Sequence, residues 1–201
     1  MRKPRSSRRY RPARRQLDLP PPKLDREIAQ ALQPLINRPA IATADIITRI
    51  GSERILLVIA AAAWAASRLQ ADRKRREAAS HVLTSLATAS LFDHLSKHVF
   101  ARQRPFLSLP DRERRQVPVS KGPYDSFLSG HAVHVGALAA ALSRIWPEWR
   151  APIWIGSGAL AATRLYLFAH WFTDVAAGLL VGVGIEKANW AARRAVKSAR
   201  R

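Results

Sequence analysis

Apolar stretches with helical periodicity, separated by short polar segments, dominate the sequence after residue 50. Alanine, leucine, valine and isoleucine fill five of them, which predict helices at about residues 54–69, 78–96, 131–147, 151–169 and 171–190. Glycines inside the last two stretches allow helices to approach closely. We find no alternation typical of β-strands and no internal repeat. The pattern therefore predicts an all-α protein, a helical bundle.

The two ends of the chain differ from this apolar region. Three prolines at 20–22 end a basic segment, and residues 24–36 have the periodicity of a short amphipathic helix. We therefore divide the chain into a basic, disordered N-terminal tail (1–22), a helical bundle (23–190) and a basic C-terminal tail (191–201).

The flanks of the apolar runs bear on whether the bundle lies in a membrane. The uninterrupted runs cover 55–66, 151–163 and 175–185, each shorter than the roughly 20 apolar residues of a full span, and such runs also form buried helices in soluble proteins. The basic cluster at 73–76 and the tryptophans at helix ends are, however, typical of membrane interfaces. We predict an integral membrane protein with about five to six transmembrane helices.

Alternation of these helices places the three polar fragments described below on one face of the membrane. The opposite face carries short basic loops, which the positive-inside rule assigns to the cytoplasm. The fragments then face the periplasm of a bacterial inner membrane. Five helices also place the arginine-rich N-terminus outside, against the same rule, and a sixth, re-entrant segment within 26–50 would reconcile the two.

The net charge is strongly positive and implies an anionic partner. The chain has 34 Lys and Arg against 14 Asp and Glu, a formal charge of +20, which suits acidic lipid headgroups, phosphate substrates or nucleic acid. Residues 1–16 carry eight of these cations, no acid and no following signal-peptide core. This tail is interpreted as solvated, as an arm on anionic lipid, or as both. Nucleic acid is not an expected partner, because aromatic residues for base stacking are nearly absent there.

Three polar fragments carry the candidate chemistry. They read Lys97-x6-Arg104-Pro105, Ser129-Gly130-His131 and Arg164-x5-His170-x3-Asp174. Lys97 and Arg104 lie two helical turns apart and face the same way if the helix persists. Such a pair either binds phosphate or is a basic cluster at the membrane surface.

The second fragment opens a helix, whose free amides and positive dipole end attract anions. Gly130 permits close approach of a phosphate to the backbone, the Ser129 hydroxyl can donate a hydrogen bond, and His131 can protonate a leaving alkoxide. An ordinary serine cap beside a histidine is the structural alternative.

The third fragment places charged residues among apolar ones, which is costly unless they are paired or functional. His170 and Asp174 share a helical face, so the carboxylate can hold one imidazole nitrogen and leave the other free to attack phosphorus. Arg164 can donate to two phosphate oxygens. The structural alternative is an Arg–Asp pair with a satisfied histidine.

Together the fragments resemble the motifs of the type 2 phosphatidic acid phosphatase superfamily, Lys-x6-Arg-Pro, Pro-Ser-Gly-His and Ser-Arg-x5-His-x3-Asp. The match spans about residues 97–174, and the helical pattern extends it to roughly 45–190. Leu128 and Thr163 stand where the family has proline and serine, which we expect to alter loop rigidity at most. Soluble vanadium haloperoxidases and bacterial acid phosphatases share these motifs.

The resemblance implies a role for each residue. His170 would be the nucleophile that forms a phosphohistidine, Asp174 would orient it, and His131 would act as general acid and then help to activate water. The phosphoryl oxygens would be held by Lys97, Arg104, Ser129, the Gly130 amide and Arg164. The sequence has no carboxylate cluster suited to Mg²⁺ and no cysteine for thiolate chemistry, so we expect hydrolysis without a metal or other cofactor.

The sequence thus favours a membrane-bound lipid phosphatase acting on a phosphomonoester or diphosphate of an isoprenyl or glycerolipid carrier. Two alternatives stay open: a basic membrane- or nucleic-acid-binding protein that keeps the fold without turnover, and a soluble acid phosphatase of the same superfamily. The lipid, the number of phosphates removed and the oligomeric state do not follow from the sequence.

Overall fold

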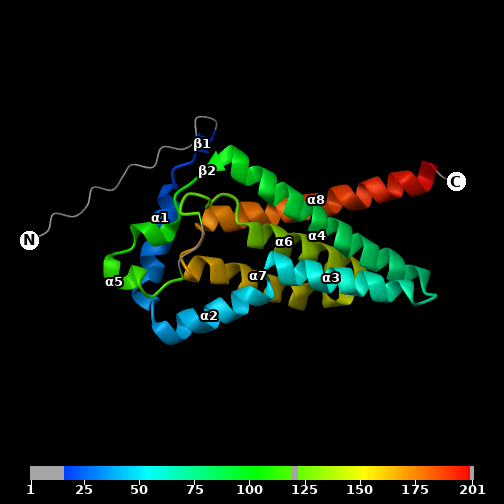
Figure 1. Cartoon of the computed structure of the whole chain (residues 1–201), viewed down its shortest axis with the longest axis horizontal. Helices are drawn as coiled ribbons and strands as arrows, with labels where there is room; N and C mark the ends of the chain where they lie inside the picture. Colours follow the sequence, from blue (N-terminus) through cyan, green and yellow to red (C-terminus); the bar gives the residue numbers. More distant parts are fainter. Residues whose placement is uncertain (1–15, 119–121, 200–201) are drawn as a thin grey trace, which may run out of the picture.

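The computed structural model describes residues 16–118 and 122–199, which form an elongated bundle of helices (Figure 1). The predicted all-α class is confirmed. The first 15 residues of the predicted N-terminal tail lie outside the described residues. Residues 191–199, predicted as part of a C-terminal tail, instead continue the last helix of the bundle.

The longer helices follow one another through the chain with short connections. They are α1 (Lys23–Leu32), α2 (Arg38–Ile50), α3 (Glu53–Arg68), α4 (Arg73–Val99), α6 (Gly130–Ile145), α7 (Arg150–Tyr166) and α8 (Phe172–Ala199). The short elements are β1 (Leu17–Asp18), η1 (Gln33–Leu35), β2 (Phe100–Ala101), η2 (Pro105–Ser108), α5 (Asp111–Arg114) and η3 (Pro147–Trp149). All five helices predicted from the apolar stretches are present.

Local capping explains where the boundaries depart from the predictions. α4 begins before the predicted residue 78 because the Asp72 side chain accepts hydrogen bonds from the amides of Lys74 at 2.8 Å and Arg75 at 3.3 Å. α2, within the segment considered as re-entrant, begins where the Asn37 side chain accepts from the Ala40 amide at 2.9 Å. The predicted helix at 24–36 is divided into α1 and η1, and Pro34 lies in η1.

Within the described ranges, a pair of two-residue strands and an isolated bridge between Arg102 and Asp125 depart from the all-helical pattern. β1 and β2 pair in parallel, with Leu17 opposite Phe100 and Asp18 opposite Ala101. Two residues are too few to show the alternation by which a strand is recognised in sequence. The pairing fixes the start of the described chain beside the end of α4.

α6 occupies the centre of the bundle, with α8, α4 and α7 packed around it (Figure 1). Its side chains are mostly small, and Ala132, Val133 and Ala137 are fully buried. Glycines let α8 lie directly on α6: a Cβ atom added to Gly182 would lie 2.2 Å from the carbonyl oxygen of Val133. This close packing brings the first turns of α6 and α8 together.

Helix length and charge both bear on the predicted transmembrane helices. In the described ranges, no helix is both long enough and apolar enough to cross a membrane. α3, α6 and α7 contain 16, 16 and 17 residues. The longer α4 and α8 carry charged residues near both ends. This finding does not support the predicted five to six transmembrane helices.

Two glycines of α8 provide a test of the α6–α8 packing. Gly182→Ala should lower the melting temperature, because the new methyl group would meet the backbone of α6, whereas a Cβ atom at Gly184 would have no neighbour within 4 Å. Gly184→Ala should leave the melting temperature unchanged or raise it, because alanine favours a helix by about 0.5–1 kcal/mol over glycine. Thermal unfolding of both variants in the same detergent measures this, and equal effects would contradict the packing.

Candidate active site

Six of the eight predicted site residues line one cavity of about 390 Å³, at the end of the bundle where α4 and α7 end and α6 and α8 begin. They are Lys97, Arg104, Gly130, His131, Arg164 and His170. The structure therefore brings the three fragments together. Ser129 and Asp174 are fully buried beside the cavity and do not line it. The catalytic role of each residue stays a prediction.

His170 lies in the connection between α7 and α8 and is held through both ring nitrogens. Its Nδ1 lies 2.7 Å from the carbonyl oxygen of Ser126, and its Nε2 lies 3.0 Å from Nη1 of Arg104. A carbonyl only accepts and a guanidinium only donates, so Nδ1 carries the proton and Nε2 presents its lone pair. Nε2 is thus the ring nitrogen suited to attack an electrophile.

The same environment keeps His170 neutral. The pKa of His170 is lowered well below 6.5, first because the ring is buried and then because Arg104, Arg164 and Lys97 repel a further positive charge. A neutral imidazole retains the lone pair that nucleophilic attack requires.

Arg104 and Lys97 are oriented by carbonyl oxygens of the loop that precedes α6. Arg104 donates to the carbonyls of Gly122 at 2.9 Å, Asp125 at 3.0 Å and Ala169 at 2.7 Å. Lys97 donates to Asp125 O at 3.1 Å and also to Leu128 O. These contacts fix both cations at the wall of the cavity.

The start of α6 has the geometry of a capped helix N-terminus. Ser129 is the N-cap, and its hydroxyl oxygen accepts from the amide of Ala132 at 3.4 Å. The hydroxyl was predicted to contact phosphate, but in the structure it is buried in this cap. Gly130 faces Asp93, whose Oδ2 would lie 2.2 Å from an added Cβ atom. A larger residue at 130 would therefore collide with a side chain of α4.

The last two of the six predicted residues in the cavity, His131 and Arg164, each have a nitrogen without a hydrogen-bond partner among the described residues. Within the described ranges, His131 Nε2 is buried without a hydrogen-bond partner, as is Nε of Arg164. Arg164 Nη1 donates to the Thr48 hydroxyl at 3.3 Å. A ring nitrogen and a guanidinium nitrogen without partners suit an incoming oxygen-rich ligand.

Asp174 differs from its predicted geometry. We expected it to hold the His170 ring, but its Oδ2 lies 3.9 Å from Nδ1, which bonds to the Ser126 carbonyl instead. Asp174 accepts from the Ser126 hydroxyl and, at 2.9 Å, from the Trp171 amide. It therefore acts on His170 through the segments on either side of the ring.

Two residues that the sequence did not indicate complete this network. Arg102, only 3% exposed, donates to Asp174 through Nη1 and to Asp25 at 2.7 Å through Nη2. Asp25, in α1, also accepts from the Thr173 amide at 2.9 Å and hydroxyl at 2.6 Å at the start of α8. Asp25 lies 77 residues before Arg102 in the sequence. No spacing in the sequence links them.

The α2–α3 region supplies a further wall that was not predicted. Asp45, Thr48 and Arg49 of α2 line the cavity, as do Ser52 and Glu53 at the start of α3. In the turn between these helices, a Cβ atom on Gly51 would lie 2.6 Å from His131 Nε2. The apolar periodicity that predicts helices does not indicate that these residues of α2 and α3 line a cavity.

The two departures from the family motifs are accommodated locally. Leu128 is 3% exposed and packs with Ala89, Val133 and Ala137. The Thr163 hydroxyl donates to the Leu160 carbonyl at 2.6 Å within α7. Neither side chain is among the residues that line the cavity.

Comparison with known proteins establishes the family. Residues 78–197, more than half of the chain, match the model of the PAP2 superfamily. The chain therefore belongs to the PAP2 superfamily, and the resemblance inferred from the three fragments is confirmed.

Its curated relatives bear phosphatase names. The chain is 31% identical over 109 residues to a lipid A 1-phosphatase of Rhizobium etli, covering 51% of this chain and 45% of that protein. It is 29% identical over 154 residues to an undecaprenyl-diphosphatase of Sulfolobus acidocaldarius, covering 74% of this chain and 70% of that protein. The chain thus spans less than half of the length of the first relative.

Solved structures share the fold at low sequence identity. A transmembrane PAP2-type phosphatidylglycerolphosphate phosphatase of Bacillus subtilis gives a TM-score of 0.68 at 20% identity, covering 86% of this chain and 85% of that one. LpxE of Aquifex aeolicus gives 0.64 at 18% identity, covering 82% and 93%.

Asp25→Asn should destabilise the protein strongly, because it removes one of the two carboxylates that balance the buried Arg102. We expect the free energy of unfolding to fall by about 3 kcal/mol or more. Glu27→Gln in the same helix is the control, because the Glu27 side chain is 55% exposed and, among the described residues, forms an ion pair with exposed Lys23 alone, so little change is expected. Denaturant unfolding measures the free energy of unfolding of both variants. A loss in Asp25→Asn no larger than the loss in Glu27→Gln would contradict the importance of the Asp25–Arg102 pair.

Stability should fall as the pH is lowered from 7 to 5. The folded-state pKa of His170 lies below its ordinary 6.5, so under acidic conditions the unfolded chain binds a proton that the folded chain does not. His170→Gln removes this contribution, and its melting temperature should depend less steeply on pH. An unchanged pH dependence in that variant would mean that His170 is not held neutral by the fold.

Proposed function

We propose that the protein is a phosphatase that hydrolyses a phosphomonoester or diphosphate through a phosphohistidine at His170. The observation that carries this proposal is the tautomer of His170, whose unprotonated Nε2 lies in a cavity lined by Lys97, Arg104 and Arg164. A nucleophilic nitrogen surrounded by cations is what attack on a phosphoryl group requires.

The proposed reaction has two displacements at phosphorus. His170 Nε2 forms a bond to phosphorus while the bond from phosphorus to the leaving oxygen breaks, and His131 gives that oxygen a proton. Water then attacks the phosphohistidine with His131 accepting its proton, which releases phosphate and frees His170. The three cations and the first amides of α6 offset the charge that develops on the equatorial oxygens.

We further propose that this charge stabilisation comes from protein groups and that no metal cofactor is needed. Support comes from the donor set: Lys97, Arg104 and Arg164 all face the cavity and carry the charge that a divalent cation supplies in other phosphoryl-transfer sites.

The substrate that we propose is an isoprenyl or glycerolipid phosphate, or another lipid phosphate. Two of the relatives are named for a lipid substrate, lipid A and undecaprenyl diphosphate. The cavity lies where α2, α4 and α7 end and α3 and α6 begin, so a headgroup can enter from a membrane interface while the lipid chains stay outside.

We place the bundle in a membrane, specifically a bacterial inner membrane with the cavity facing the periplasm. Support comes from large apolar side chains that point outward from four helices: Val58 on α3 (68% exposed), Leu91 on α4 (61%), Ile155 on α7 (73%) and Leu180 on α8 (72%). Exposed apolar surface on this scale is unusual for a soluble monomer.

His170→Ala and His131→Ala should each lower kcat by about a thousandfold or more, because the nucleophile or the proton donor is lost. His98→Ala is the matched control, because His98 is an exposed histidine at the end of α4 that does not line the cavity. Phosphate release from a panel of lipid phosphates, with and without a chelator, measures activity. Undiminished turnover by His170→Ala would refute the covalent route, and inactivity of the native protein on every substrate would favour a non-catalytic binding protein.

A further inference from the structure

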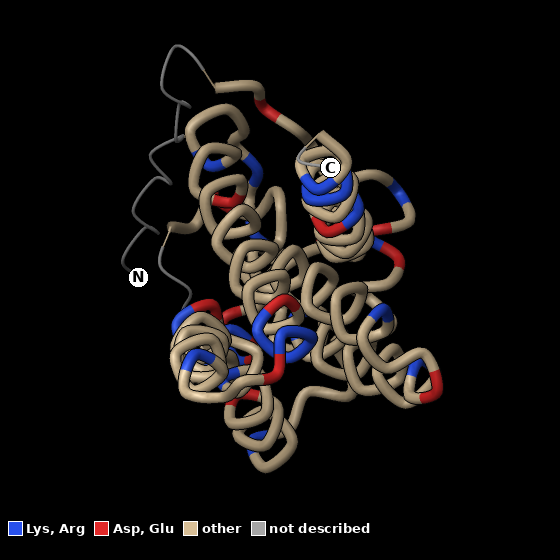
Figure 2. Tube along the Cα trace, turned by 90° about the vertical axis from the view of Figure 1, so that its right-hand side faces the viewer, with Lys and Arg blue, Asp and Glu red and all other residues tan. Residues whose placement is uncertain are grey.

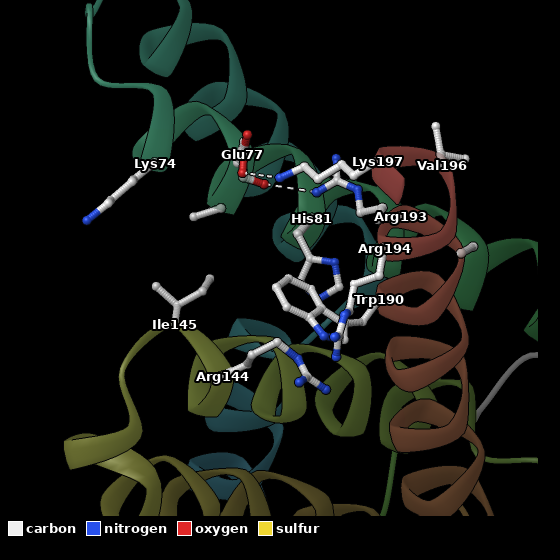
Figure 3. Close-up of a pocket in the computed structure, with 12 residues that line it drawn as sticks. Lys74, Glu77, His81, Arg144, Ile145, Trp190, Arg193, Arg194, Val196 and Lys197 are labelled. Carbon is white, nitrogen blue, oxygen red and sulfur yellow. Dashed lines mark hydrogen bonds and ion pairs between the residues drawn. The ribbon is translucent and has the colours of Figure 1, made fainter. Parts of the chain in front are cut away.

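A second cavity, of about 700 Å³, lies at the opposite end of the bundle from the candidate active site (Figure 3). It is bounded by the first turns of α4, the last turn of α6 and the final turns of α8. Figure 2 looks toward this end and shows Lys and Arg gathered along the last turns of α8. None of the residues assigned above to phosphoryl transfer lines it.

A buried network from three helices forms the back of this cavity. Glu186 of α8, 1% exposed, accepts from Arg144 of α6 at 2.6 and 3.0 Å and lies 2.8 Å from Nε2 of His81 of α4. The Arg144 guanidinium lies 4.7 Å from the ring centre of Trp190, which His81 also contacts edge-on. His81 Nδ1 is buried without a hydrogen-bond partner within the described ranges. The back of the cavity is thus a fixed polar and aromatic wall.

The rim of the cavity carries more positive than negative charge. Lys74, Arg193, Arg194 and Lys197 line it, and Glu77 is the acid among the lining residues. Glu77 pairs with Lys197, and its carbonyl accepts from Arg193 at 3.0 Å. The side chains of Lys74 and Arg194 make no hydrogen bond or ion pair within the described part of the chain. Two cations are therefore available to a ligand.

Apolar surface continues from this rim into a neighbouring groove. A cavity of about 790 Å³ between α3, α4 and α6 shares Lys74, Ala78 and Ile145 with the first and is otherwise lined mainly by apolar side chains. On the other side, Val196 of α8 is 52% exposed and lines the cationic cavity. Cations beside a long apolar groove match a molecule with an anionic head and an aliphatic chain.

We propose that this end of the bundle binds an anionic phospholipid, with its headgroup on the cationic rim that Lys74 and Arg194 bound from opposite sides and an acyl chain along Ile145 in the adjoining groove. A free phosphate ion would leave the groove uncovered. A single-stranded nucleic acid would stack its bases on exposed aromatic faces, but the face of Trp190 is covered by the Arg144 guanidinium. The proposal does not depend on the activity proposed for the other end.

Native mass spectrometry of the full chain in detergent, titrated with phosphatidylglycerol or phosphatidylcholine, tests the site. Wild type should prefer phosphatidylglycerol, and the double variant Lys74→Gln/Arg194→Gln should bind it about tenfold more weakly or worse, because each cation near a lipid phosphate contributes a several-fold factor in affinity. Arg150→Gln/Lys187→Gln is the matched control, because it removes two exposed cations that do not line the cavity and should retain full binding.

A second variant tests the cavity without changing charge. Ala192→Trp places a large ring in the cavity from an exposed position on α8 and should also weaken binding of phosphatidylglycerol. Excess inorganic phosphate should not displace the lipid. Equal losses in the two double variants would show non-specific attraction, undiminished binding in Lys74→Gln/Arg194→Gln would place the lipid elsewhere, and displacement by inorganic phosphate would identify a site for free anions; each result would overturn the proposal.

Discussion

Four cations and two histidines line one small cavity, and the whole candidate site depends on how the mutual repulsion of the cations is offset. Arg104 donates to backbone carbonyls of residues 122, 125 and 169, whereas Lys97 donates to the carbonyls of residues 125 and 128 and also lies 3.7 Å from the Asp93 carboxylate. Carbonyl oxygens orient a cation without cancelling its charge, so the cavity stays attractive to an anion. At Lys97 a phosphate would compete with the Asp93 carboxylate, whereas Arg104 forms no ion pair within the described ranges.

Two further carboxylates, Asp25 and Asp174, lie behind the cavity and do not line it. Asp174 and Asp25 lie on either side of Arg102, and the Asp174 carbonyl accepts from the Ser129 amide at 3.2 Å. Arg102 thereby connects α1 to the first turn of α8, and Asp174 connects α8 to the cap of α6. Burial makes breaking any of these contacts expensive, which keeps the His170 ring in one orientation relative to the start of α6.

The sequence was sufficient for the helices and for the convergence of the three fragments, because both follow from local patterns. Apolar periodicity identified α3, α4, α6, α7 and α8, and motif spacing identified the residues that line the cavity. The sequence did not predict the contacts that hold those residues in place. Asp25 reaches Arg102 across 77 positions, and Gly51 packs on His131 across 80, and neither separation leaves a periodic signal. The Asp174–His170 contact was predicted from helical spacing, but His170 precedes the first residue of α8, so that spacing did not apply.

The cations at the two ends of the bundle differ in burial, and they therefore differ in how they can bind an anion. Arg104 is 7% exposed and its guanidinium is directed by four partners, so it can discriminate between phosphoryl geometries. Lys74 and Arg194 are exposed and have no side-chain partner among the described residues, so they can attract an anion but cannot select its shape. Under the two proposals made above, the buried cavity would recognise the group to be cleaved. The exposed cations at the other end would hold surrounding anionic lipid without competing for the reaction.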